Sequence, residues 1–321
     1  MALPGKWDGW GRVEALTSLL FNGAQLPTSA TLNVLNPTIE HMVAEGLWND
    51  QNRSLLTNCL CLLPFLDDPS TGFARLRQVI SEKKFPPHEL RHIVNAVGGS
   101  RCDEALTFLR EIARSLGNQL KQIREEWIKA IAAIGSPESK HLLLSFVGTE
   151  ANEFLAEVTL DDHEGGLLAS IIADMALAES EIKHHVLRLC DTELSITKRS
   201  LLSKVVTRLN TLDAVIAGLS LINDSTKPSV PYGVQEAIEA VFLEWRPHGK
   251  TGWFMLVSRG SNEIRARLFE MVTKDDRRKK SAFALLGQIE VWRLEHGRPI
   301  TEPRHPAFDS SEMWPPIRTA V

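Results

Sequence analysis

Two His-Glu pairs offer the residue types that most often bind a metal. They are His88-Glu89 and His163-Glu164. Imidazole and carboxylate together suit iron or zinc, so each pair could supply two ligands. Pro87 precedes the first pair and two glycines follow the second, so the pairs hold different places in their segments. Pairs at such different places are more often part of a loop or a helix start than of a metal site, and we expect no bound metal and no other cofactor.

Other catalytic chemistry leaves no motif in the chain. The four cysteines, Cys59, Cys61, Cys102 and Cys190, form no CxxC pair and no zinc signature, so we expect buried small side chains. No GxxxxGK[ST] phosphate loop, no GxGxxG fingerprint and no GxSxG nucleophile elbow occurs. We therefore predict that the protein is not an enzyme.

Charge is distributed unevenly along the chain. The net charge is −4 and the pI about 6.2, which argues against a general nucleic-acid binder. Residues 149–182 contain nine acidic side chains and neither Lys nor Arg. Two basic stretches follow, and our candidate partner-binding residues there are Lys198, Arg199, Lys204, Arg208, Arg265, Arg267, Arg277 and Arg278. On a concave face they would attract an acidic protein or a phosphate backbone; otherwise they form a solvated outer face.

The tryptophans divide into core and surface candidates. We expect those inside helical segments to be buried: Trp127, Trp245, Trp253 and Trp292. Trp314 stands before Pro315-Pro316, where no helix interior can form. It either straps the C-terminal tail onto the rest of the chain or anchors another protein, and we add it to the candidate binding residues.

The elements that must position these residues are helices. Apolar residues recur at spacings of three and four over residues 101–116 and 120–134, which predicts amphipathic helices there. Alternating strand patterns and Val-Thr-rich runs are hard to find, so we predict an all-α fold.

Short breaks rich in Gly, Pro, Asp and Ser separate the helical segments. They start at residues 67, 98, 135, 178, 209 and 246, so they recur every 31 to 43 residues. This period is typical of a two-helix repeat, in which stacked hairpins share one core.

One internal pair of breaks is the most alike. Ala96-Val97-Gly98-Gly99-Ser100 and Ala133-Ile134-Gly135-Ser136-Pro137 each join an apolar helix end to a second apolar helix. In this pattern, and in the hydrophobic-Arg pairs Ile123-Arg124 and Ile264-Arg265, the chain resembles the HEAT-repeat family over roughly residues 52–292. The resemblance implies a right-handed α-α superhelix, with about seven or eight hairpins by the two-helix rule.

The two ends differ from the middle. We expect residues 1–50 to be an atypical helical cap with helices near 12–21 and 33–47, and residues 51–297 to be HEAT-like repeats. Residues 298–321 contain five prolines and should form an extended tail. The first ten residues lack an apolar signal sequence, and the longest apolar run, residues 165–178, contains an aspartate. We expect a cytoplasmic protein without a membrane partner.

Two functions from different classes remain open. The first is a non-enzymatic scaffold or adaptor that binds a protein partner, as a subunit of a larger assembly. The second is a solenoid that binds nucleic acid through the basic helices between Lys198 and Lys280. A minor alternative follows from the resemblance, because HEAT-like deoxyhypusine hydroxylases bind two irons through several His-Glu motifs. The two pairs here are too few for that ligand set.

Overall fold

A computed structural model describes residues 9–44, 50–82, 85–150, 160–209 and 211–221, with a few residues between 266 and 287. The described residues are almost entirely helical, and their one β feature is an isolated bridge between Leu26 and Leu66. The chain divides into two compact units, residues 1–143 and 144–321. The all-α prediction is therefore confirmed for the described residues.

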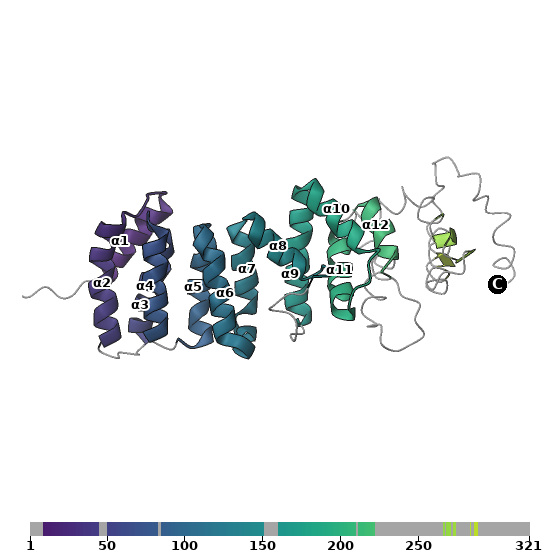
Figure 1. Ribbon diagram of the computed structural model, residues 1–321. Coiled ribbons are helices and arrows are strands. Elements are labelled where there is room, and N and C mark those ends of the chain that lie inside the picture. The colour runs from purple at the N-terminus through teal and green to yellow at the C-terminus, as the bar shows by residue number, and fades with distance from the viewer. Residues whose placement is uncertain are drawn as a thin grey trace, which may run out of the picture. The chain divides into compact units, whose positions relative to one another are not determined.

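The first unit is a series of helical hairpins (Figure 1). Its helices are α1 (Gly9–Phe21), α2 (Thr28–Ala44), α3 (Asp50–Leu62), α4 (Pro69–Glu82), α5 (Pro87–Ser100), α6 (Asp103–Leu116), α7 (Arg124–Ile134) and α8 (Pro137–Ser145), whose last residues belong to the second unit. Two 3₁₀ turns lie between helices: η1 (Leu63–Phe65) between α3 and α4, and η2 (Gly117–Gln122) between α6 and α7. The odd-numbered helices pack in the order α1, α3, α5, α7, while α4 packs on α6 in a second layer.

The second unit repeats this arrangement. It contains α9 (Asp162–Ala178), α10 (Ser180–Leu189), α11 (Ile196–Leu209) and α12 (Leu212–Leu219). Helices α9 and α11 pack together, and α10 packs on α12. Helices α9 to α12 thus touch both a hairpin partner and the matching helix of the other hairpin, which is how a repeat array buries its core.

The apolar stripes predicted from the sequence form this core. On α6, Leu106, Leu109 and Ile112 are buried, as the three-four spacing predicts. Trp127 of α7 is buried beside them, and its indole Nε1 donates a 2.9 Å hydrogen bond to the Leu109 carbonyl. Predicted burial of Trp127 is confirmed; the other three tryptophans expected in the core lie outside the described residues.

Most of the predicted breaks are turns within a hairpin. Gly135 ends α7 with φ of 70°, the left-handed conformation that glycine adopts freely, and Glu179 separates α9 from α10. The break predicted at Gly98 lies three residues further along, at Arg101. Gly98 itself lies inside α5, at the point where this helix packs against the backbone of α7. A Cβ there would lie 2.5 Å from the Ala130 backbone of α7.

Helix bounds elsewhere shift by several residues. Helix α2 begins at Thr28, before the expected residue 33, and α7 begins at Arg124 because the 3₁₀ turn η2 occupies residues 117–122. None of the described helices is both long enough and apolar enough to cross a membrane. The described residues do not test the predicted right-handed superhelix, and the predicted tail at residues 298–321 lies outside them.

Candidate partner-binding surfaces

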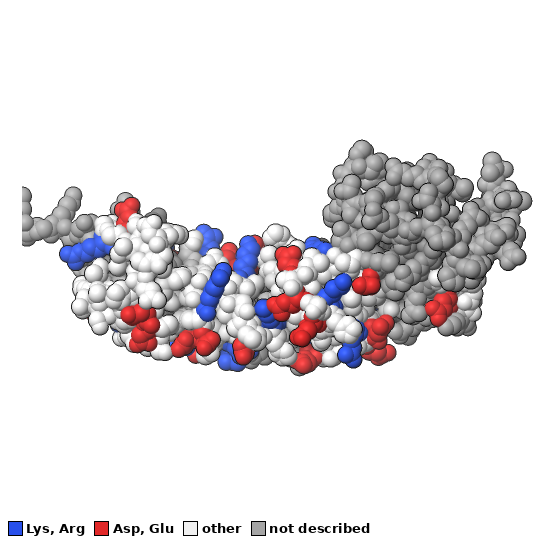
Figure 2. Space-filling view, turned by 90° about the horizontal axis from the view of Figure 1, so that it is seen from above, with Lys and Arg blue, Asp and Glu red and all other residues white. Residues whose placement is uncertain are grey.

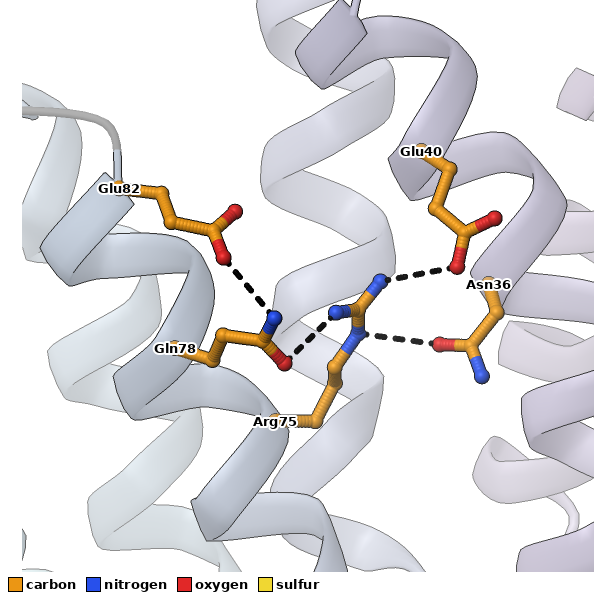
Figure 3. A network of polar contacts seen from close by, with 5 residues as sticks. All are labelled: Asn36, Glu40, Arg75, Gln78 and Glu82. Atoms are coloured by element: carbon orange, nitrogen blue, oxygen red, sulfur yellow. Dashed lines mark hydrogen bonds and ion pairs between the residues drawn. The ribbon is translucent and has the colours of Figure 1, made fainter.

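Arg75 on α4 ties that helix back to α2 (Figure 3). Its Nε donates to the Asn36 Oδ1 at 3.1 Å, and its Nη2 lies 3.5 Å from the Glu40 Oε1. Its Nη1 donates to the Gln78 Oε1 at 2.8 Å, and the Gln78 amide in turn donates to Glu82 at 2.8 Å. The Arg75 side chain is mostly buried, so this planar group fixes the spacing of two helices.

Arg77, two residues along α4, points forward to α6. Its Nε and Nη2 donate to the two carboxylate oxygens of Glu111 at 2.7 and 3.3 Å. Its guanidinium lies 5.7 Å from the ring centre of Phe108, which meets Phe73 edge to face. Helix α4 therefore holds its two neighbours with one arginine on each side.

These ties have a common sequence spacing. The bonds from Arg75 to Asn36 and Glu40 span 39 and 35 residues, and the Arg77–Glu111 pair spans 34. In the second unit, Arg208 donates to Ser170 across 38 residues. These separations match the predicted repeat period, because each tie joins equivalent helices of successive hairpins. Of these residues the sequence analysis named only Arg208, as a partner-binding candidate. Oppositely charged side chains about one period apart, such as Arg77 and Glu111, were the signal that could have found the charged pairs.

The turns of the first two hairpins are also tied together. The Asp67 carboxylate accepts hydrogen bonds from the Thr28 amide, at 2.8 Å, and from the Thr28 hydroxyl. These bonds hold the pKa of Asp67 below its ordinary value of 3.8. Because the folded-state pKa is lowered, this contribution to stability is present above pH 3.8 and is lost as the pH falls through the lowered value.

Lys198, the first candidate binding residue, is engaged by its own chain. Its ammonium donates to the carbonyls of Ser145 at 3.3 Å, Gly148 at 2.5 Å and Glu150. Burial lowers the pKa of Lys198, and the nearby Glu150 carboxylate opposes that shift in part. The side chain thus satisfies carbonyls at the last residue of α8 and just after it, which is a structural role.

The other described candidates also lie on α11. The Arg199 Nη2 lies 3.5 Å from the Leu194 carbonyl. Lys204 and Arg208 extend toward α9, where Cβ atoms on Gly165 and Gly166 would lie 3.5 and 3.6 Å from their terminal nitrogens. The structure therefore brings Lys204 and Arg208 together and directs Lys198 elsewhere. Outside the described residues lie the side chains of Arg265, Arg267, Arg277, Arg278 and Trp314.

The two His-Glu pairs take part in helix starts. Glu89, in the first turn of α5, lies 3.2 Å from Arg53. Glu164 forms a reciprocal capping box with Asp161 at the start of α9. Among the described residues, no three His, Cys, Asp or Glu side chains gather closely enough to hold a metal. In the described parts, both glutamates therefore have local structural partners.

The cysteines behave as packed side chains in the described helices. Burial raises the pKa of Cys59, Cys61 and Cys190 to about 12. A thiol with such a pKa is protonated at neutral pH and is a weak nucleophile and metal ligand. Cys102 is half-buried, with its Sγ 3.4 Å from the Ser100 Oγ.

Surface charges are mixed in sign. On the face shown in Figure 2, Lys and Arg alternate with Asp and Glu over the described helices, without a large patch of one sign. The N-terminal hairpin carries few charges: Arg12, Glu14 and Glu40 are the only Lys, Arg, Asp or Glu of α1 and α2. A docking surface based on charge alone is therefore not evident on this face of the described residues.

Comparison with known families gives one match. Residues 237–315 match the family described as NACHT C-terminal Alpha/Beta 2, which covers about a quarter of the chain. No curated protein and no solved structure matches the chain. The match crosses the expected boundary at residue 297 between repeats and tail. Most of the matched stretch lies outside the described residues, and the few described residues within it are helical.

Proposed function

We propose that this chain is a non-enzymatic scaffold or adaptor, a HEAT-like α-solenoid that holds a protein partner within a larger assembly. The supporting observation is the hairpin packing, with Arg75 and Arg77 tying α4 to equivalent helices of the hairpins before and after it. Stacked hairpins of this kind present long surfaces whose length grows with repeat number, which suits them to hold other macromolecules.

The family match supports a particular kind of assembly. The name of the matched family refers to the C-terminal region of NACHT proteins. We therefore propose that the assembly contains a NACHT domain, on the same chain or on a partner. The helical hairpins before residue 222 would then form the surface that receives the partner.

The described part of the proposed surface centres on Lys204 and Arg208. Both cations extend from α11 to the glycine pair of α9, where the absence of side chains lets their terminal nitrogens lie close to the helix, and Arg208 also donates to Ser170 there. Lys198 donates to three backbone carbonyls and contributes less to a partner, whereas Arg199 makes one 3.5 Å contact with the Leu194 carbonyl. An acidic protein segment is the chemistry that complements this pair.

The test is cross-linking of the tagged full chain in its native host, followed by mass spectrometry and reconstitution with the purified partner. We expect cross-links from a specific protein to the described helices. The double variant Lys204→Glu, Arg208→Glu should weaken that partner's binding at least tenfold. Arg91→Glu, an exposed basic position on α5, is the control and should leave binding unchanged. Failure to recover any protein above a tag-only control contradicts the proposal.

Nucleic-acid binding is the second candidate, because Lys204 and Arg208 lie together on α11. It predicts binding of labelled DNA or RNA at low salt, with affinity falling steeply as salt rises. Charge reversal at Arg265 and Arg267 should also lower the affinity for DNA or RNA. Absence of binding to any nucleic acid at low salt eliminates this candidate without affecting the first.

A further inference from the structure

Helix α12 carries its large and its small apolar residues on different faces. The large ones are Leu212, Val215, Ile216 and Leu219. At about 100° per residue, these four positions fall within an arc of roughly 100° around the helix axis. The small ones are Ala214, Ala217 and Gly218. They fall within a second arc of about the same width, centred roughly 160° from the first, so the apolar stripe of large residues lies nearly opposite them.

The face of small residues packs on the rest of the second unit. Ala214 is fully buried, and a Cβ on Gly218 would lie 3.3 Å from the Val206 Cγ1 of α11. Beside this face, the Asp213 carboxylate lies 3.4 Å from the Lys183 ammonium of α10. The main contacts of α12 in the described part of the chain are with these two helices. Helices α10 and α11 therefore approach α12 from the side of its small residues, and the stripe belongs to the other side.

An apolar outer stripe does not suit the last helix of a repeat array. The terminal repeat of such an array needs a polar outer face to remain soluble. Asp213 is the one charged residue in the sequence of α12, and it lies toward α10. In the described hairpins, the second helix of one packs on that of the next, as α4 does on α6 and α10 on α12. The packing should therefore continue past α12, with further residues covering the stripe.

The chain itself supplies a segment that can reach the stripe. Residues 222–321 follow α12 directly, and the stretch that matches a known family begins at residue 237. The connection over residues 222–236 spans up to about 50 Å when extended, whereas α12 is about 12 Å long. The start of the matched stretch can therefore return along the whole length of the helix.

This returning segment has the complementary chemistry. Ile238, Val241 and Phe242 recur near the start of the matched stretch at spacings of three and four, a pattern that predicts one apolar side. Two apolar surfaces that meet leave water together, which is the main favourable contribution to such a contact.

We propose that the apolar stripe of α12 is the docking surface for residues 237–243 of the same chain. The contact covers the stripe and packs the start of the family-matched stretch against the helical array. The C-terminal region is then held beside α12 at a fixed position, and does not hang from a flexible linker.

Photo-cross-linking of the full chain tests the proposal. The photoreactive residue p-benzoylphenylalanine takes the place of Leu219, near the centre of the stripe, and unlabelled chain is mixed with an equal amount of ¹⁵N-labelled chain. We expect cross-links to residues 237–243 whose two peptides carry the same label, because the contact is within one chain. The same residue in place of Asp213, which lies toward α10, is the matched control. It should link to α10 at least tenfold more often than to residues 237–243.

Hydrogen exchange of substituted full chains gives a second measurement. The double variant Leu212→Ser, Leu219→Ser should speed amide exchange in residues 237–243 at least fivefold, while unchanged protection of α9 and α11 verifies that the unit keeps its fold. Leu177→Ser, at a 55% exposed apolar position on α9, is the control and should leave that exchange unchanged. The proposal is overturned if cross-links from position 219 miss residues 237–243, if they join labelled to unlabelled chains, or if the double variant leaves exchange in residues 237–243 unchanged.

Discussion

At the scale of single residues, the hairpin turns show how one side chain can add strain. Gly135 and Arg101 end α7 and α5 in the same left-handed conformation, with φ of 70° and 55°. A residue with a Cβ loses about 1–2 kcal/mol in this region, whereas glycine does not. Two equivalent turns of successive hairpins thus differ in one residue type, and Arg101 has the strained backbone.

Replacing Arg101 should therefore stabilise its turn. We expect Arg101→Gly to raise the free energy of local opening in α5 and α6 by about 1 kcal/mol, and Gly135→Ala to lower it in α7 and α8 by a similar amount. Amide hydrogen exchange measures both. Arg101→Ala is the control, since it removes the side chain and keeps the strain. If Arg101→Ala raised the free energy of local opening as much as Arg101→Gly, the effect would come from the arginine side chain and not from the backbone conformation.

Cysteine reactivity depends on burial at individual positions. Because burial raises the pKa of Cys59, Cys61 and Cys190 to about 12, their thiolate fraction at pH 8 is about one in ten thousand. We expect iodoacetamide to label Cys102 first in the folded protein, and the other three only in urea. Mass spectrometry of timed digests measures the order. Labelling of Cys59 as fast as Cys102 without urea would contradict the expectation.

At the scale of helices, α5 approaches α7 closely at Gly98. A Cβ on Gly98 would lie 2.5 Å from the Ala130 carbonyl oxygen, which belongs to the backbone and cannot rotate away. A Cβ on the adjacent Gly99 would meet only the Phe65 ring, at an ordinary 3.6 Å. Neighbouring glycines in one helix therefore have different roles.

The two glycines should respond oppositely to the same change. Gly98→Ala should destabilise the α5–α7 contact by about 1–3 kcal/mol, since the helices must move apart. Gly99→Ala should be neutral or stabilising by up to about 1 kcal/mol, because alanine favours the helix. Denaturant midpoints of the two variants against the unsubstituted chain give the comparison. Equal destabilisation by both variants would mean that the contact of Gly98 with the Ala130 backbone does not determine how closely α5 and α7 pack.

These helices also show what the sequence could predict. The stripes at Leu106, Leu109 and Ile112 and the turn at Gly135 were readable because local spacing and backbone preference determine them. The role of Gly98 was not, because its contact lies on another helix. The same holds for Lys198, whose acceptors are backbone carbonyls that leave no mark in the residue types.

At the scale of the whole chain, the stabilising contacts are between neighbours. Arg75 and Arg77 reach only the adjacent hairpins, and Arg208 reaches from α11 to α9. A protein held together in this way has a stability that is nearly a sum of repeat and nearest-neighbour contributions.

Local damage should therefore remain within one unit. We expect Gly98→Ala to speed amide exchange in α5, α7 and adjacent helices, while α9 to α11 keep their protection. Leu202→Ala, which empties a fully buried position on α11, should do the reverse and lower local stability by about 2–5 kcal/mol. Hydrogen exchange read by mass spectrometry resolves both units in one sample. Equal loss of protection in both units from either variant would contradict this expectation and show that the chain opens as a single cooperative body.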